Sequence, residues 1–285
     1  MRARSLVGFF LLALFIFPAP AQQPATAPVE VDLYCSGMVT NEAVPRDTFL
    51  ITGEQSNFKV TFQQGDLVYI NKGSSHGVKV GDEFLVSRRE KDPLKYKWFS
   101  QQPGLLRAMG KVWADLGRLR VVHVSADVST AEIVYSCSYM QRGDIVQPFQ
   151  QRPAPPYKQA GGFDHFATVS GKPVGMVVAM KGFAQAGSAG DPVYVNLGSS
   201  QGVKVGDYLR IFRYQGIQNE SAYQTWRQSF RVYGYGSVPL RYNWENVPRE
   251  IIGEGIVLRV SPNAATVLLT LSRREVYTGD YAEIQ

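Results

Sequence analysis

The stretch DLVYINKGSSHGVKVGD, from Asp66 to Asp82, returns in the second half of the chain as DPVYVNLGSSQGVKVGD, from Asp191 to Asp207. The offset is 125 residues, and 13 of the 17 positions are identical. A weaker match, at an offset of 136, aligns the stretch that begins at Gly117 with the stretch that begins at Gly253. Solenoid repeats recur every ~20–50 residues, so a longer period predicts a duplicated domain.

The repeated stretches have the composition of short strands. Leu67–Ile70 is β-branched and aromatic, and it ends at a turn signal. Valines alternate with Lys79 over Gly77–Asp82, a pattern that predicts a half-buried strand or hairpin arm. Further strand-like runs follow at Gly117–Val124 and Ala131–Ser136. We therefore expect a mainly all-β chain of two tandem small β-barrels or sandwiches.

Glycine and aspartate recur at matching positions of the two stretches: Gly73, Gly77, Gly81 and Asp82 in the first, and Gly198, Gly202, Gly206 and Asp207 in the second. A positive φ or a sharp bend at a barrel corner would require glycine there. The aspartates are suited to accept hydrogen bonds from turn amides. A phosphate-binding loop is the alternative, but the Gly-Lys-Ser/Thr ending of such a loop is missing. The pattern favours structural turns.

The first residues predict export. Residues 1–21 combine Arg2 and Arg4 with an apolar run, Leu6–Phe17, and small residues before Gln22, as in a signal peptide. The apolar run is shorter than the ~20 residues that cross a bilayer. An uncleaved anchor is the alternative. We expect no membrane insertion after cleavage, and a periplasmic or an extracellular location.

Composition shifts divide the rest of the chain. We expect a flexible N-terminal linker over residues 22–32, a first β-barrel repeat over 33–150, a Pro/Gly-rich linker over 151–162 and a second repeat over 163–285. Without residues 1–21, 28 basic residues face 24 acidic ones. A net charge of this size is no electrostatic footprint for nucleic acid.

The glycine pattern also resembles a known family. Gly73-Ser-Ser-His-Gly77-Val-Lys-Val-Gly81-Asp82 with Gly143-Asp144, and Gly198 to Asp207 with Gly279-Asp280, resemble the C-terminal domain of the flagellar assembly protein T family. The resemblance covers about half of each repeat. It implies a small periplasmic β-barrel from an envelope-spanning assembly, present here in two tandem copies.

The chain has two cysteines, Cys35 and Cys137, one near each end of the first repeat. An even pair in an exported protein tends to oxidise, so a disulfide is predicted. Two buried free thiols are the main alternative, and a catalytic or metal role is a third. The histidines His76, His123 and His165 lack metal-site spacing, and we expect no metal and no cofactor.

Each repeat carries a non-repeating insertion, Arg89–Leu116 in the first and Tyr214–Ile252 in the second. All four tryptophans lie in these insertions. The spacing of aromatic residues over Ala222–Phe230 predicts a helix in the second insertion. Aromatic and arginine residues are enriched at interface hot spots, so we predict a partner surface at Trp98, Phe99, Tyr223, Trp226, Arg227, Phe230 and Trp244. The alternative is that these side chains pack on their own barrel.

Three functions compete on these grounds. The first is a non-catalytic cell-envelope scaffold or assembly module that binds another envelope protein through its insertions. The second is a glycan- or peptidoglycan-binding module, because aromatic rings offer flat faces to sugars. The third is an envelope hydrolase. Gly73-Ser-Ser-His-Gly77 has the spacing of the Gly-x-Ser-x-Gly nucleophile motif, but a histidine this close to a serine in the sequence cannot be assumed to activate it, and the sequence favours a protein that is not an enzyme.

Overall fold

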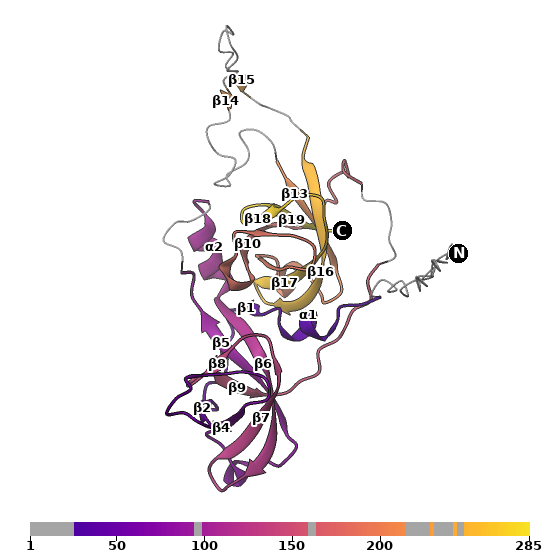
Figure 1. Ribbon diagram of the computed structural model, residues 1–285. Coiled ribbons are helices and arrows are strands. Elements are labelled where there is room, and N and C mark those ends of the chain that lie inside the picture. Colours follow the sequence, from indigo (N-terminus) through magenta and orange to yellow (C-terminus); the bar gives the residue numbers. More distant parts are fainter. Residues whose placement is uncertain (1–25, 94–98, 159–163, 215–228, 231–241, 244–247) are drawn as a thin grey trace, which may run out of the picture.

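The computed structural model describes residues 26–93, 99–158, 164–214, 229–230, 242–243 and 248–285. Figure 1 shows two β-units, one from each half of the chain, with the second stacked on the first. Strands dominate the regular structure of these residues, which confirms the all-β class.

The first unit is a strongly curved sheet. Its main strands are β2 (Leu50–Gly53), β4 (Leu67–Ile70), β5 (Glu83–Glu90), β6 (Lys111–Val124), β7 (Ser129–Ser136) and β9 (Ile145–Pro148). They lie in the order β2-β4-β7-β6-β5-β9, and a bridge between Phe49 and Ile145 joins the two edges. Strand β1 (Met38–Thr40) pairs with the start of β6, and β3 (Thr61–Phe62) pairs with β8 (Met140–Gln141).

The second unit is a closed barrel. Its strands are β10 (Val174–Met180), β12 (Pro192–Val195), β13 (Tyr208–Arg213), β16 (Glu250–Ser261), β17 (Ala264–Ser272) and β19 (Tyr281–Ile284), in the order β10-β12-β17-β16-β13-β19. Two short ladders also belong to the second half of the chain. Strand β11 (Ala186–Gly187) pairs with β18 (Val276–Tyr277). Strand β14 (Ser229–Phe230) pairs with β15 (Tyr242–Asn243) outside the barrel wall.

The two units have the same strand order, element by element. Four β-bulges interrupt the main ladders of each unit, and they fall at matching positions. One lies between Val86 and Ser87 in the first unit and between Ile211 and Phe212 in the second. Bulges bend and twist a strand locally, so matching bulges give matching curvature. Common ancestry of the two units stays an inference from the sequence.

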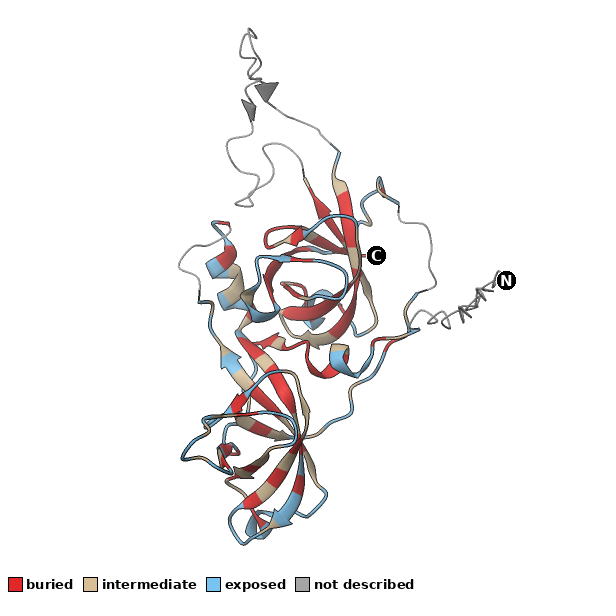
Figure 2. Cartoon of the chain, in the orientation of Figure 1, coloured by how far each residue is buried: buried red, intermediate tan, exposed pale blue. Residues whose placement is uncertain are grey.

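Alternation along the strands fills both interiors. Val68 and Ile70 of β4 are fully buried in the core of the first unit, and Val193 and Val195 of β12 are fully buried in the second. Figure 2 shows that buried residues are concentrated in the strands of both units. Side chains two residues apart lie on the same face of a strand, so one face of β4 and one face of β12 point into a barrel core.

The helices differ from the expectation. The described α-helices are α1 (Glu30–Tyr34) and α2 (Gln102–Met109), and α2 lies in the first insertion, where none was predicted. A proline in its first turn and Gly110 at its end account for its bounds. In the second insertion, Phe230 lies in strand β14, so the prediction of a helix that includes Phe230 is wrong. Residues 222–228 lie outside the described residues.

The prediction of a strand over Gly77–Asp82 is also wrong. This stretch follows a 3-10 turn, η1 (Ser74–His76), and runs as successive turns into β5. Val78 is buried, but Val80 is 66% exposed. The valine alternation arises because one side chain covers the barrel end and the other faces solvent.

Candidate binding site: a groove at the end of the first barrel

The repeated glycines shape the loop at one end of each barrel. Gly77 and Gly202 both have φ 83°, and Gly81 and Gly206 both have φ 93°. These values lie in the left-handed region that glycine adopts without a Cβ penalty. The expectation of positive φ is therefore correct at these four positions.

The first glycine of each loop is there for another reason. Gly73 has an extended backbone with φ −132°, so the expectation of a positive φ does not hold for it. A Cβ on Gly73 would lie 2.2 Å from the carbonyl oxygen of Ser125, and one on Gly198 would lie 2.3 Å from that of Ser261. Glycine is needed because two backbone segments approach closely.

This difference gives a testable ranking. Gly198→Ala is expected to lower the free energy of unfolding by about 2–3 kcal/mol, because backbone must move to admit the methyl group. Gly202→Ala is expected to cost about 1 kcal/mol, because it meets only the left-handed backbone penalty in open space. Urea denaturation of the two variants measures both values. Equal losses would contradict the close-approach explanation.

The loop aspartates act as expected. Asp82 Oδ2 accepts a hydrogen bond of 2.9 Å from the Lys79 amide, and Asp207 Oδ2 accepts one of 2.8 Å from the Lys204 amide. The side chains therefore satisfy amides that the turn leaves without a ladder partner.

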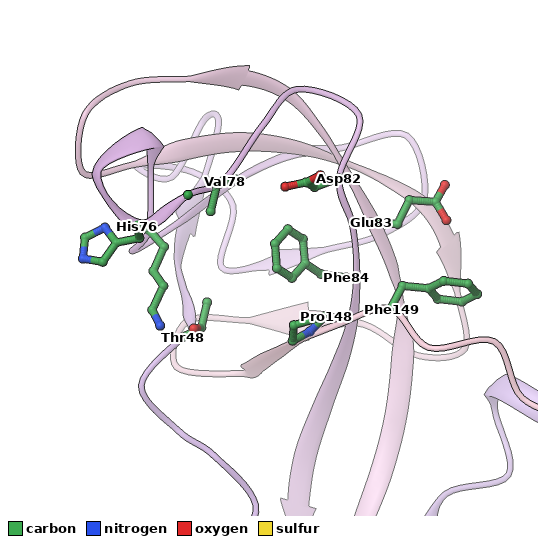
Figure 3. A pocket seen from close by; sticks show the side chains of 10 residues that line it. Thr48, His76, Val78, Asp82, Glu83, Phe84, Pro148 and Phe149 are labelled. Atoms are coloured by element: carbon green, nitrogen blue, oxygen red, sulfur yellow. The ribbon is translucent and has the colours of Figure 1, made fainter.

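A groove of about 630 Å³ opens beside the loop of the first barrel. Figure 3 shows that its side chains come from the loop at His76 to Asp82, from the start of β5, and from the segment at Pro148 and Phe149. Phe84 and Val78, each 8% exposed, form its apolar floor. Charged groups stand around this floor, which is the usual arrangement of a small-molecule or peptide site.

Two charged side chains of the groove form ion pairs with neighbouring residues. Lys72 forms an ion pair with Asp47, and Glu83 accepts hydrogen bonds of 3.0 and 3.1 Å from Arg120. In the second barrel, the position of Lys72 is taken by Leu197, which is only 2% exposed. The lysine in place of a buried leucine makes this end of the first barrel polar.

The loop also brings a serine, a histidine and an aspartate together. Ser75 Oγ lies 3.1 Å from His76 Nδ1, 2.9 Å from Asp127 Oδ1 and 2.6 Å from the Ala126 carbonyl oxygen. In a Ser-His-Asp triad the carboxylate binds the second nitrogen of the histidine. Here the carboxylate reaches the serine, so these contacts tie two loops together and do not activate a nucleophile.

A segment we call the strap, residues Leu33–Thr40, lies between the two barrels. Leu33 and Tyr34 pack with Ile256, Leu258 and Leu268 of the second barrel. The carbonyl of Ser36 accepts a hydrogen bond of 3.0 Å from Tyr194, and that of Gly37 accepts one of 3.2 Å from Thr266. Burial raises the pKa of the Tyr194 phenol, so this group stays protonated and donates.

A disulfide fixes the strap to the first barrel. It joins Cys35 to Cys137, across a sequence separation of 102 residues and a Cα distance of 5.4 Å. This is the pairing that the sequence favours over two free thiols. Because Cys35 lies in the strap, the bond also holds one side of the junction between the barrels.

A buried ion cluster holds the other side of this junction. Asp115, 8% exposed, accepts two hydrogen bonds of 3.0 Å from Arg152 and one of 2.9 Å from the Gly37 amide. Arg259 of the second barrel lies 3.3 Å from the same carboxylate. Asp115 of the first barrel thus contacts the strap through Gly37, the linker through Arg152 and the second barrel through Arg259.

Each barrel closes with an arginine–aspartate pair. Arg88 binds Asp144 through two hydrogen bonds of 2.7 Å, and Arg213 binds Asp280 in the same way. Both aspartates belong to the Gly-Asp pairs of the sequence pattern. Bidentate pairs of this kind are the strong form of ion pair, and these join the turn just before the last strand to the strand before the insertion.

A carboxylate in the last strand of the second barrel supports a pH prediction. Glu283 is fully buried and accepts hydrogen bonds of 2.8 Å from Arg249 and Arg210. Burial would raise the pKa of the Glu283 carboxyl, but the two guanidinium groups outweigh it and hold the pKa below its ordinary value. The ionised form therefore stabilises the fold, and this stabilisation is lost as pH falls below the ordinary glutamate value towards the lowered one.

We expect Glu283→Gln to lower the free energy of unfolding by about 2 kcal/mol at pH 7. The difference from the wild type should shrink as pH falls below about 4 towards the lowered pKa of Glu283, because the carboxyl then takes up a proton and becomes neutral like the amide. Thermal melts from pH 3 to pH 7 measure this. A difference that stays constant over this range would contradict the assigned role of the carboxylate.

The predicted partner surface is only partly tested. Phe99 is 4% exposed and packs with Val39, Met109 and Tyr194 between the barrels. Its assignment to an open partner surface is wrong, because α2 folds this part of the insertion back onto the second barrel. Phe230 lies in β14. Trp98, Tyr223, Trp226, Arg227 and Trp244 lie outside the described residues.

The comparisons with known proteins give no relative: no protein-family model and no curated protein matches the chain. The resemblance to the flagellar assembly protein T family therefore stays a prediction. Within the described ranges, no helix is long and apolar enough to cross a bilayer. The same residues contain no group of three or more His, Cys, Asp or Glu side chains placed to hold a metal ion.

Proposed function

We propose that the chain is an exported, non-catalytic scaffold module of the cell envelope, and that it binds another envelope protein. The observation that carries the proposal is the junction between the barrels. The strap, its disulfide and the Asp115 cluster hold two similar barrels in one fixed arrangement. A body of this kind presents its surfaces at a constant spacing, which suits a protein that positions others.

Export is part of the same proposal. The leader-like sequence of residues 1–21 and the disulfide both support it, because disulfides persist in oxidising compartments outside the cytosol. Periplasmic and extracellular material from the native host, separated and probed for the chain, would distinguish the two locations. Retention of the chain in the cytosol would contradict the proposal.

The groove of the first barrel is the surface we assign to the partner. Its floor is formed by Phe84, which is only 8% exposed, polar groups surround this floor, and the second barrel has a buried leucine where the groove has Lys72. An extended peptide or an exposed loop of the partner fits such a groove, since it supplies both an apolar side chain and backbone groups.

Site-specific photo-crosslinking in the native host tests this assignment. A crosslinker at His76 is expected to capture an exported protein, whereas one at Gln201, the matching exposed loop position of the second barrel, is not. The captured protein, once purified, should bind the wild type and lose at least about tenfold in affinity for Phe84→Ala or Glu83→Lys. Equal capture at both positions, or unchanged affinity, would contradict the assignment.

A glycan or peptidoglycan ligand is the second candidate, because aromatic rings accompany the polar groups of the same groove. Phe84 and Phe149 both line it, together with Asp82 and His76. Co-sedimentation with peptidoglycan sacculi separates the two candidates. Sedimentation that Phe84→Ala abolishes would favour the glycan, and a chain that stays in the supernatant would exclude peptidoglycan.

A further inference from the structure

The second barrel docks on the first through the outer face of its wall. We call Met176, Val178, Tyr194, Leu258 and Ala264 the docked face. Each is at most 9% exposed, although each lies outside the barrel core, because the strap, α2 and their neighbours cover it. This internal interface shows what kind of surface the outer wall of such a barrel accepts.

The first barrel carries the same outer face, and it is uncovered. The ladders align Leu50 with Val177 and Val121 with Val257, which fixes the equivalence residue by residue. The positions of the docked face are then taken, in the same order, by Phe49, Ile51, Tyr69, Val122 and Val128, which we call the free face. The four aliphatic and phenylalanine side chains of the free face are 36–40% exposed.

The second barrel has an exposed apolar segment at the same distance in sequence before its aligned residue, although this segment is not a strand. In the first barrel, Val39 of the strap lies 11 residues before Leu50, and it is buried against the docked face. The residue 11 positions before Val177 is Phe166, which is 76% exposed, and Val169 beside it is 66% exposed. The chain therefore has an exposed apolar projection on its second barrel and a partly exposed apolar outer face on its first.

The projection is held in a fixed place. The carbonyl of His165 accepts a hydrogen bond from the Ile251 amide, and the carbonyl of Ala167 accepts one of 2.9 Å from Arg249. Arg249 in turn is anchored on the buried Glu283. The residues on both sides of Phe166 are therefore held by hydrogen bonds to their carbonyl groups. Val39 is held in a comparable way by the pairing of β1 with β6.

We propose that Phe166 and Val169 of one copy dock on the free face of a second copy, head to tail, as the strap docks on the docked face within the chain. The contact joins two different surfaces, so each added copy leaves one of each open, and association continues into rings or open filaments. The equivalents of Ile256 and Leu268 on the first barrel are Arg120 and Glu132, so the contact between copies is more polar than the internal one and depends on concentration.

The inference rests on the proposed scaffold function and deepens it, because it names a second copy as one partner. None of the five residues of the free face lines the groove of His76 and Phe84. Loss of self-association would leave crosslinking at the groove unchanged, so the two proposals fail separately.

Sedimentation velocity of the exported chain tests the inference. We expect the wild type to shift from one copy to two or more as its concentration rises. Ile51→Glu and Phe166→Glu should each remain one copy, because each removes one of the two surfaces. The matched control is Phe58→Glu, since Phe58 is 94% exposed and belongs to neither surface. It should behave as the wild type, and melts should show that all three variants are folded.

Mixing the two variants identifies the geometry. Ile51→Glu keeps the projection and Phe166→Glu keeps the free face, so an equimolar mixture should form pairs and nothing larger. A Phe166→Glu variant that still associates alone would overturn the head-to-tail contact in favour of face-to-face pairing. A wild type that stays one copy up to about 1 mM would overturn self-association altogether.

Discussion

Replacing Cys35 and Cys137 together by serine is expected to lower the free energy of unfolding by about 4–5 kcal/mol. The bond closes a loop of about 100 residues, and the unfolded chain gains most of this conformational freedom when the bond is removed. The strap is freed at the same time, so the contacts of Tyr194 and Thr266 with its carbonyl groups weaken. Chemical denaturation with and without reductant measures the loss.

The double serine variant carries its own control. Reductant should destabilise the wild type to about the level of this variant and leave the variant unchanged. Hydrogen exchange should rise in the strap and at the junction, beyond the first barrel itself. A wild type that melts at the same temperature with and without reductant would contradict the prediction, as would free thiols at both positions in the exported protein.

Removing the carboxylate that pairs with Arg213 should be almost as costly. Asp280→Ala is expected to lower the free energy of unfolding by about 3–5 kcal/mol, because it leaves a guanidinium group buried without its partner. The Arg213 side chain is 8% exposed and the Asp280 side chain is fully buried. Asp280 also accepts a hydrogen bond of 2.7 Å from the Tyr277 amide, which is lost as well.

Two variants sharpen the test at Asp280. The double variant Arg213→Met with Asp280→Leu should recover much of the loss, since it leaves no buried charge. Arg274→Ala is the control, because Arg274 is 64% exposed and its ion pair with Glu250 should contribute about 0–1 kcal/mol. Urea denaturation compares the three. A loss at Asp280→Ala no larger than that at Arg274→Ala would show that the pair does not hold the barrel.

The sequence predicts what local geometry determines. The left-handed φ of Gly77 and Gly202 and the amide contacts of Asp82 and Asp207 follow from turn chemistry within a few residues. The all-β class follows from strand composition and spacing in the same way. The valines around Lys79 mislead, because a period of two is also produced by a turn that covers a barrel end.

The arrangement of the barrels could not be predicted, because it depends on contacts between distant residues. Phe99 is of a residue type that is common at partner surfaces. Only the packing of α2 on the second barrel shows that Phe99 contacts residues of its own chain. The groove could not be predicted either. The alignment places Lys72 opposite Leu197, but the sequence does not show that this leucine is buried. The Arg88 and Arg213 pairs leave a weak signal, an arginine and a Gly-Asp pair in each repeat.

Both cysteines lie within the first 137 residues, and the strand that carries Tyr194 is made later. If the exported chain enters an oxidising compartment N-terminus first, the covalent link can therefore close before the second barrel has folded. The strap is then already attached to the first barrel when the second barrel folds. The second barrel can therefore dock on a segment whose position is fixed. The position of this one bond thus allows the first barrel and the strap to be linked before the second barrel docks.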